Sequence, residues 1–206
     1  MFLEKKTGVA RLPFLLVMNG TILFLNGTSS SGKTSLLHRL QDELPEPFLN
    51  LGIDRFIFML PQRYLNRPLW DEVLGKAIHA GTAGMALFSG MHHAIAAAAK
   101  RGNHVIADHV FVEKAWVDEC AQLFSEMNAY LVGVHCPLHV LEQRERHRKD
   151  RTLGQARAQF DVVHKYTIYD LELDTSVLTT QQCVEQIIER LKDPPEAFKR
   201  LKTLLI

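Results

Sequence analysis

A glycine-containing run near the start of the chain limits the fold more than any other feature of the sequence. Residues 27–34 read GTSSSGKT and match the pattern G-x-x-x-x-G-K-[ST] in full. The apolar run TILFL precedes them, and Leu36, Leu37 and Leu40 recur at helical spacing after them. A strand, a glycine turn and a helix in this order begin a βα unit, and such units build parallel sheets covered by helices.

The rest of the chain repeats this alternation of apolar runs and helical patterns. Further strands are expected at residues 48–53, 104–107, 130–135 and 171–173. Helices are expected at residues 32–43, 84–101, 114–127, 138–149, 180–191 and 197–206. The sequence therefore predicts an α/β fold with a doubly wound, parallel, five-stranded sheet of the P-loop NTPase or kinase type.

The length of 206 residues suits a single domain, which we expect over residues 19–206. A proline- and glycine-interrupted stretch at about residues 55–90 is too long for an ordinary connection, so we expect it to be an insertion that builds an acceptor pocket. A charged stretch at about residues 144–157 is expected to form a helical lid. Residues 1–18 are expected to be an N-terminal arm, with Met18 as an alternative start.

Composition excludes several classes of protein. The net charge is +1, with 24 basic and 23 acidic residues, so no overall field attracts nucleic acid. No apolar run approaches the roughly 20 residues that cross a bilayer. The three cysteines form no C-x-x-C pair and the ten histidines show no metal-ligand spacing. We expect a cytoplasmic protein with no nucleic-acid or membrane partner, and leave a homo-oligomer open.

The residue types of the glycine-containing run explain its chemistry. Gly27 and Gly32 let the backbone curl so that successive N–H groups point at phosphate oxygens, and the following helix presents its positive end. Lys33 reaches the β- and γ-phosphates, and the Thr34 hydroxyl binds magnesium. The bland alternative is a glycine turn with a surface lysine. The sequence predicts ATP and Mg²⁺ bound by Gly27, Thr28, Ser29, Ser30, Ser31, Gly32, Lys33, Thr34 and Ser35, with Arg144 and Arg151 from the lid.

Two aspartates stand where predicted strands end. Asp54 follows residues 49–53 and Asp108 follows residues 104–107. Ligands of such sheets gather at the carboxyl ends of the strands, and an aspartate there typically holds magnesium or its water shell. A kinase also needs a group that deprotonates the attacking hydroxyl, so the two carboxylates divide these duties. The alternative is that each aspartate caps the next helix.

Arginines gather in the predicted lid at Arg144, Arg146, Arg148 and Arg151. Guanidinium groups stay charged and bind phosphate through two hydrogen bonds, so a lid that closes over ATP would use one or two of them. The alternative is a solvated helix face with the i,i+4 pairs Glu142–Arg146 and Glu145–Lys149. RNA binding lacks the interleaved aromatic residues that it usually needs.

Taken together, these pieces resemble the chloramphenicol phosphotransferase family over about residues 21–191. The matching pieces include LNGTSSSGKT at residues 25–34, GID at 52–54, VIADHVF at 105–111, RER at 144–146, VH at 163–164 and YDLELDT at 169–175. The resemblance implies ATP-dependent phosphorylation of a hydroxyl on a small, antibiotic-like molecule. Chloramphenicol-like molecules are the expected acceptors, and antibiotic resistance is the expected biological role.

The same resemblance implies roles for single residues. Asp54 falls on the proposed general base of the family, and Asp108 supports the metal or the substrate. The lid arginines of the family carry over to the region of Arg144 and Arg148, which complete the catalytic set with Lys33 and Asp54. The turn at residues 173–175 is similar to the family's turn near the nucleotide base, where Asp174 braces the loop.

Residues 59–90 depart from the antibiotic enzyme, so other functions stay open. A kinase of nucleotide sugars similar to zeta toxins would share the aspartate and the arginines. It needs a polar pocket, and the run FIFML at residues 56–60 argues against one. An ATP-binding regulator or hydrolase would work without an acceptor and would offer a partner surface such as residues 197–206.

Overall fold

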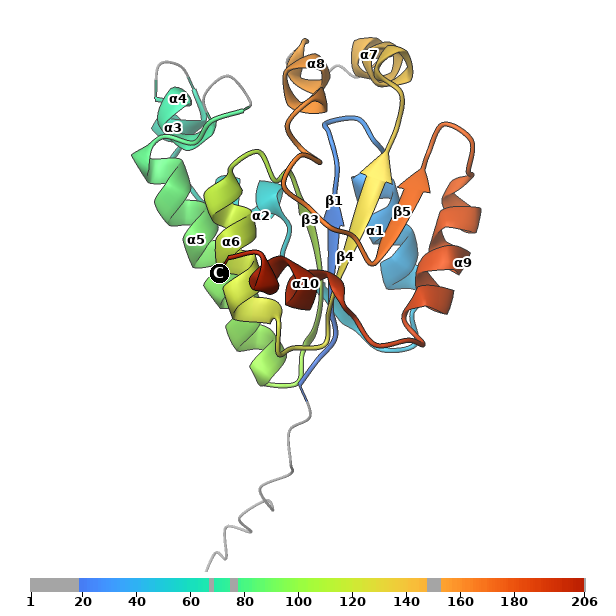
Figure 1. The fold of residues 1–206 in the computed structure, drawn as a ribbon. Helices are drawn as coiled ribbons and strands as arrows, with labels where there is room; N and C mark the ends of the chain where they lie inside the picture. Colours follow the sequence, from blue (N-terminus) through green and yellow to red (C-terminus); the bar gives the residue numbers. More distant parts are fainter. Residues whose placement is uncertain (1–18, 67–68, 75–77, 148–152, 206) are drawn as a thin grey trace, which may run out of the picture.

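A computed structural model of the chain describes residues 19–66, 69–74, 78–147 and 153–205. One five-stranded sheet has the order β2-β3-β1-β4-β5, and every pair of neighbouring strands is parallel (Figure 1). The strands are β1 Ile22–Asn26, β2 Phe48–Asn50, β3 His104–His109, β4 Ala129–His135 and β5 Leu171–Asp174. The predicted parallel five-stranded sheet is therefore confirmed, with β1 at its centre.

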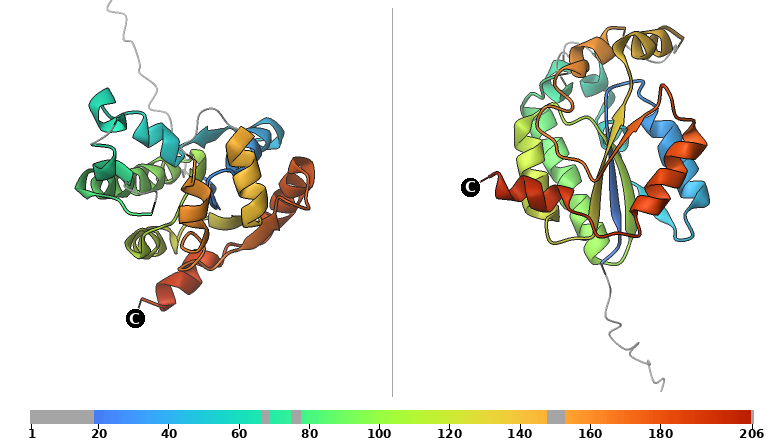
Figure 2. Two further views of the ribbon diagram at one scale, coloured as in Figure 1. Left: turned by 90° about the horizontal axis from the view of Figure 1, so that it is seen from above. Right: turned by 45° about the vertical axis from the view of Figure 1, so that its right-hand side comes forward.

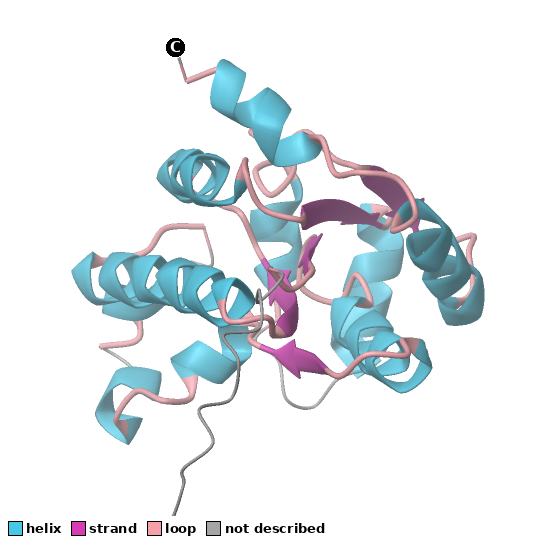
Figure 3. Cartoon of the chain, turned by 90° about the horizontal axis from the view of Figure 1, so that it is seen from below, coloured by secondary structure: helices cyan, strands magenta, loops and turns pink. Residues whose placement is uncertain are grey.

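Helices cover both faces of the sheet, as the view from its lower end shows (Figure 3). One face packs against α1 (Lys33–Glu43) and α9 (Thr180–Arg190); the other packs against α5 (Thr82–Lys100), α6 (Lys114–Phe124) and α10 (Ala197–Thr203) (Figure 2). In β1, Ile22 and Phe24 enter the larger apolar cluster, whereas Leu23 and Leu25 enter the smaller one. Because successive strand residues point to opposite faces, residues 22–25 all have to be apolar.

The remaining helices of the described chain stand at the carboxyl end of the sheet (Figure 1). The predicted insertion contains α2 (Ile53–Ile57), α3 (Gln62–Leu65) and α4 (Asp71–Leu74), and it runs into the first half of α5. The predicted lid contains α7 (Leu138–His147) and α8 (Gln155–Phe160). All these segments therefore surround the end of the sheet where parallel α/β folds bind their ligands.

Several predicted boundaries differ from the structure. The second strand ends at Asn50 rather than at residue 53, because the Asn50 side chain accepts the Gly52 N–H at 3.2 Å and the chain turns into α2. The third strand continues through Asp108 to His109, two residues beyond its predicted end. Helix α8 was not predicted, and the predicted N-terminal arm at residues 1–18 lies outside the described residues.

In the described part of the chain, no helix combines the length and the apolar character needed to cross a membrane.

Candidate nucleotide-binding and catalytic site

Residues 27–34, the phosphate-binding loop, join β1 to α1 as the sequence predicts. Ser30 and Gly32 have φ angles of 65° and 97°, in the left-handed region. A loop with such residues turns successive peptide N–H groups toward one side and forms a concave anion site. A Cβ on Gly27 would lie 2.4 Å from the Val134 carbonyl oxygen, so only glycine allows the loop to pass this close to β4.

The polar side chains of this loop indicate that it binds a ligand rich in oxygen. Lys33 is only 7% exposed, and its ammonium donates hydrogen bonds of 2.7 Å to the carbonyl oxygens of both Gly27 and Thr28. The hydroxyls of Ser29, Ser30 and Ser31 are buried and have no hydrogen-bond partner among the described residues. Buried hydroxyls are normally paired. Three unpaired ones beside a buried ammonium fit a phosphate group.

Oxygen groups suited to magnesium lie near the loop. Thr34 is in the first turn of α1 and is partly exposed. Asp108 is 8% exposed and pairs in register with Leu25 of β1, two residues before the loop. The described residues contain no group of three or more His, Cys, Asp or Glu side chains that could hold a metal. Magnesium usually keeps several waters and takes one or two protein ligands together with substrate phosphates.

Asp108 packs against Gly52, a glycine two residues before Asp54. Gly52 packs so closely on Asp108 that a Cβ there would lie 1.7 Å from the carboxylate oxygen Oδ1. Gly52 is also the N-cap of α2, and Asp54 lies in the first turn of this helix, partly exposed. The helix-capping alternative is therefore wrong for both aspartates, since Gly52 caps α2 and Asp108 lies inside β3.

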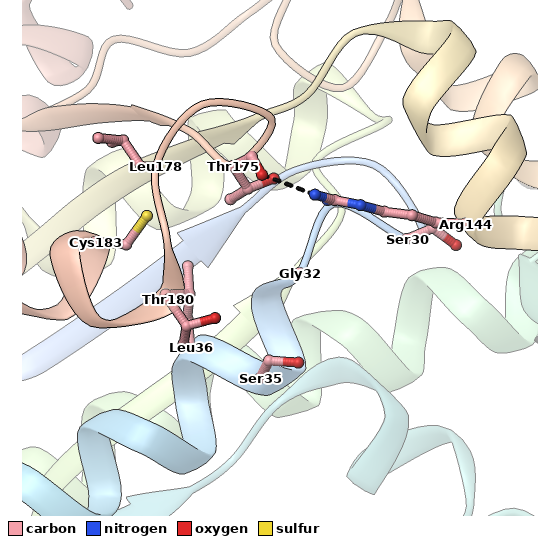
Figure 4. A pocket seen from close by; sticks show the side chains of 9 residues that line it. All are labelled: Ser30, Gly32, Ser35, Leu36, Arg144, Thr175, Leu178, Thr180 and Cys183. Carbon is pink, nitrogen blue, oxygen red and sulfur yellow. Dashed lines mark hydrogen bonds between the residues drawn. The ribbon is translucent and has the colours of Figure 1, made fainter.

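A cavity of about 230 Å³ opens beside the loop, between α1 and the segment that follows β5 (Figure 4). Arg144 of α7 lies at this cavity and donates to the Thr175 hydroxyl at 3.0 Å and to its carbonyl oxygen at 2.7 Å. The Thr175 hydroxyl in turn donates to the Ser31 carbonyl oxygen at 2.8 Å. The cavity is lined by Ser30, Gly32, Ser35, Leu36, Arg144, Thr175, Leu178, Thr180 and Cys183.

This mixture of apolar and polar lining suits a nucleotide base and ribose. The Asp174 carboxylate accepts the N–H and the O–H of Ser176 at 2.8 and 2.6 Å, so it braces the turn that carries Thr175. These hydrogen bonds to the charged carboxylate lower the pKa of Asp174.

The lid is held by carboxylates in a way that the sequence did not suggest. Glu145 is 2% exposed, and its carboxylate accepts hydrogen bonds from the N–H groups of Gly154 and Ala156 at 2.8 and 3.0 Å. It thus binds backbone N–H groups at the N-terminal end of α8. Glu142 pairs with Arg157 at 2.6 Å rather than with a residue of its own helix. Glu145 is therefore buried rather than part of a solvated face, and its expected partner Lys149 lies outside the described residues. Arg148 and Arg151 lie outside the described residues.

Sequence reasoning missed a hydrogen-bonded chain beside the phosphate-binding loop. Asn26 donates to the Tyr169 hydroxyl oxygen at 2.6 Å, and this hydroxyl lies 2.6 Å from Nδ1 of His164. The His164 ring stacks on His135, with ring centroids 4.0 Å apart. Asn26 lies more than a hundred residues before the other three residues in sequence, so only the place of these residues in the matching family pieces pointed to them.

Two further histidines, His92 and His109, lie on the opposite side of β3 from Asp108. His109 is fully buried, and its Nε2 lies 3.0 Å from Nε2 of His92, whose Nδ1 lies 2.5 Å from the Glu119 carboxylate. Because the Val110 N–H donates to Nδ1 of His109, the proton of a neutral His109 ring sits on Nε2. Burial, together with the neighbouring His92, holds the pKa of His109 well below its usual value.

Comparison with known proteins agrees with this geometry. The profile of the family described as chloramphenicol phosphotransferase-like protein matches residues 20–192. A protein of Mycobacterium tuberculosis, provisionally named an O-phosphotransferase, is 32% identical over 198 residues, which cover 89% of this chain and 88% of the relative; the match is the same in strains CDC 1551 and H37Rv.

Solved structures share the fold at low identity. A sugar kinase from Janibacter has a TM-score of 0.64 at 16% identity and covers 84% of this chain and 95% of its own. The APS kinase of Mycobacterium tuberculosis has a TM-score of 0.59 at 16% identity, covering 85% and 99%. A gluconokinase from Sinorhizobium meliloti has a TM-score of 0.58 at 15% identity, covering 85% and 93%. The predicted P-loop kinase fold is thereby confirmed.

Proposed function

Because this chain belongs to the chloramphenicol phosphotransferase-like family and is a small-molecule kinase, we propose that it transfers the γ-phosphate of ATP to a hydroxyl of a chloramphenicol-like acceptor. The observation that carries this proposal is the phosphate-binding loop. It combines two residues with positive φ, a buried Lys33 ammonium and three buried serine hydroxyls without a partner among the described residues. Such a loop binds the phosphates of a nucleotide.

Lys33 and the loop amides hold the β- and γ-phosphates in this proposal, and the cavity beside Arg144 and Thr175 takes the base. Thr34 and Asp108 would hold magnesium, which offsets negative charge on the phosphates when bound. The close packing of Gly52 on Asp108 supports this assignment, because it fixes the carboxylate next to the start of α2.

Asp54 acts as the general base. The acceptor oxygen forms a bond to the γ-phosphorus. At the same time the bond between the γ-phosphorus and the β,γ-bridging oxygen breaks, and the electron pair of this broken bond leaves with ADP. Asp54 takes the proton of the acceptor hydroxyl in this step. Arg144, with Arg148 and Arg151 of the lid, binds the negative charge of the nucleotide and of the transferred group. The place of Asp54 in the first turn of α2, two residues after Gly52, supports this role.

An apolar acceptor is favoured by side chains of the insertion. Phe58 and Met59, at the end of α2, are 71% and 66% exposed. Large exposed apolar side chains of this kind commonly mark a ligand or interaction surface. A nucleotide sugar would instead need polar contacts. We further propose a cytoplasmic enzyme that takes part in antibiotic resistance, since ATP is available there and Cys120, Cys136 and Cys183 are free thiols.

The test is to incubate the purified chain with ATP, Mg²⁺ and chloramphenicol, and to measure the acceptor by mass spectrometry. We expect the gain of one phosphoryl group, lost in Lys33→Ala and Asp54→Asn but kept in the controls Lys100→Ala and Asp42→Asn, which change exposed helix positions. If a nucleotide sugar were phosphorylated and chloramphenicol were not, the acceptor would be a nucleotide sugar and not a chloramphenicol-like molecule. If the chain bound ATP but phosphorylated no compound of a metabolite library, the proposed kinase activity would be contradicted.

A further inference from the structure

The last turn of α8 and the segment that follows it bind to the phosphate-binding loop and to the residue before it. Gln159 is 1% exposed, and its side-chain oxygen accepts the Ser29 N–H at 2.7 Å. Four residues later, the Val163 carbonyl oxygen accepts a hydrogen bond of 2.8 Å from the side chain of Asn26, which directly precedes the loop. Both contacts are buried. They hold His164, the next residue, at the edge of the phosphate site.

The direction of the hydrogen bonds around Asn26 follows from its two backbone partners. Its side-chain oxygen accepts the Phe111 N–H at 2.8 Å, so its nitrogen is the group that donates to Val163 and to Tyr169. The Tyr169 oxygen therefore accepts from Asn26, and we assign its own proton to the contact of 2.6 Å with Nδ1 of His164. A neutral His164 that accepts at Nδ1 carries its proton on Nε2, at the opposite edge of the ring.

Electrostatics keep this ring neutral. Burial is the main cause that lowers the pKa of His164 to about 3, and the charges of His135 and Lys33 act in the same direction. Burial also raises the pKa of Tyr169 to about 12, so the phenol keeps the proton that it donates. Nε2 of His164 has no hydrogen-bond partner in the part of the chain that the structure describes. The Lys33 charge contributes to the lowering of the His164 pKa, and Val163, the residue before His164, contacts Asn26 directly before the phosphate-binding loop.

We propose that His164 is a catalytic residue that binds the terminal phosphate of ATP through Nε2–H, an inference that rests on the proposed function. A neutral donor suits this place, because it binds phosphate oxygen without repelling the nearby Lys33 ammonium. No bond is made or broken at the ring. Asn26 and Tyr169 are positioning residues, since they fix the tautomer and the orientation of the imidazole.

The experiment compares two nucleotides that differ in the terminal phosphate. Isothermal titration calorimetry of the full chain with Mg²⁺ measures the Kd of ADP and of AMP-PNP, the β,γ-imido analogue of ATP. We expect His164→Ala to raise the Kd of AMP-PNP by about 10- to 100-fold, the usual value of a hydrogen bond to a charged group, and to leave the Kd of ADP unchanged. His164→Gln retains an N–H donor and should partly restore AMP-PNP binding.

Two more variants separate binding from support of the loop. Tyr169→Phe keeps the ring but removes the hydroxyl that orients it, so it should weaken AMP-PNP selectively and by less than His164→Ala. His38→Ala, an exposed histidine of α1, is the matched control and should change neither Kd. The melting temperature of each variant without nucleotide shows that it is folded.

The inference and the proposed function fail in different ways. Equal weakening of ADP and AMP-PNP in His164→Ala would overturn the inference, because the ring would then only support the loop. Unchanged affinity for both nucleotides would also overturn it. If the unmodified chain bound neither nucleotide, the nucleotide site itself, and with it the proposed function, would be wrong.

Discussion

The phosphate-binding loop and the insertion at about residues 55–90 stand at the same end of the sheet but are built differently. The loop is almost wholly buried and uses backbone geometry, with positive φ at Ser30 and Gly32. The insertion consists of short helices and presents Phe58 and Met59 to solvent. Phosphate is the same group for every kinase, so a backbone cradle can bind it, whereas the acceptor must be distinguished by side chains.

The largest effect should come from Asp54, directly before the insertion. Asp54→Asn removes the base but preserves the shape, so we expect kcat for phosphotransfer to fall by about 100- to 10,000-fold, the usual contribution of general base catalysis. The KM for ATP should stay unchanged in steady-state assays. Asp42→Asn, at an exposed position of α1, should retain full activity. If Asp54→Asn had the same kcat as the wild type, Asp54 would not be the general base.

The next effect concerns the nucleotide side alone. Arg144→Ala breaks two hydrogen bonds to Thr175 at the cavity, and we expect the KM for ATP to rise by about 10- to 100-fold. The KM for the acceptor should change little, because the insertion lies elsewhere. Arg146→Ala is the control, since Arg146 is an exposed neighbour on the same helix. If Arg144→Ala changed only the KM for the acceptor, Arg144 would belong to the acceptor site and not to the nucleotide site.

A smaller effect should appear on the acceptor side. Met59→Ala removes an exposed apolar side chain of the insertion, so we expect the acceptor KM to rise by about 3- to 10-fold with the KM for ATP unchanged. Leu204→Ala, which truncates a similarly exposed side chain at the far end of α10, should change neither constant. Equal KM values for the acceptor in Met59→Ala and the wild type would mean that this surface does not bind the acceptor.

The smallest effect concerns stability. The folded-state pKa of His164, about 3, is below its value of 6.5 in the unfolded chain. The unfolded state therefore takes up a proton first, and the free energy of unfolding should decrease as pH falls from about 6.5 toward 3. His164→Gln should weaken this decrease in urea titrations, whereas His79→Gln, an exposed histidine of the insertion, should not. The same pH dependence in His164→Gln and the wild type would contradict the burial argument.

The sequence predicted best where local residues decide the structure. The strand, turn and helix around the phosphate-binding loop were predicted because Gly27 and Gly32 meet a local backbone requirement. The end of β2 was predicted three residues too late, because residues 51–53 continue its apolar run while Asn50 turns the chain. Hydrophobic pattern alone does not show such a side-chain contact.

Tertiary contacts explain what the sequence could not supply. Helix α8 begins where Glu145, a residue of another helix, accepts two backbone N–H groups. His164 gains its fixed orientation from Tyr169 and from Asn26, which is 143 positions away from that tyrosine. No periodicity or motif spacing connects such residues. The roles of Asp54, Asp108 and the lid arginines stay predictions for the same reason, since they depend on groups that meet only when substrates bind.

The central claim is that ATP cleavage is coupled to phosphorylation of an acceptor hydroxyl. It is tested most directly by measuring, in one reaction with chloramphenicol, the ADP formed and the phosphorylated acceptor formed. The account predicts about one phosphorylated acceptor for each ADP, and little ADP when the acceptor is left out. Equal ADP formation with and without acceptor, and no phosphorylated product, would show an ATP hydrolase and contradict the account.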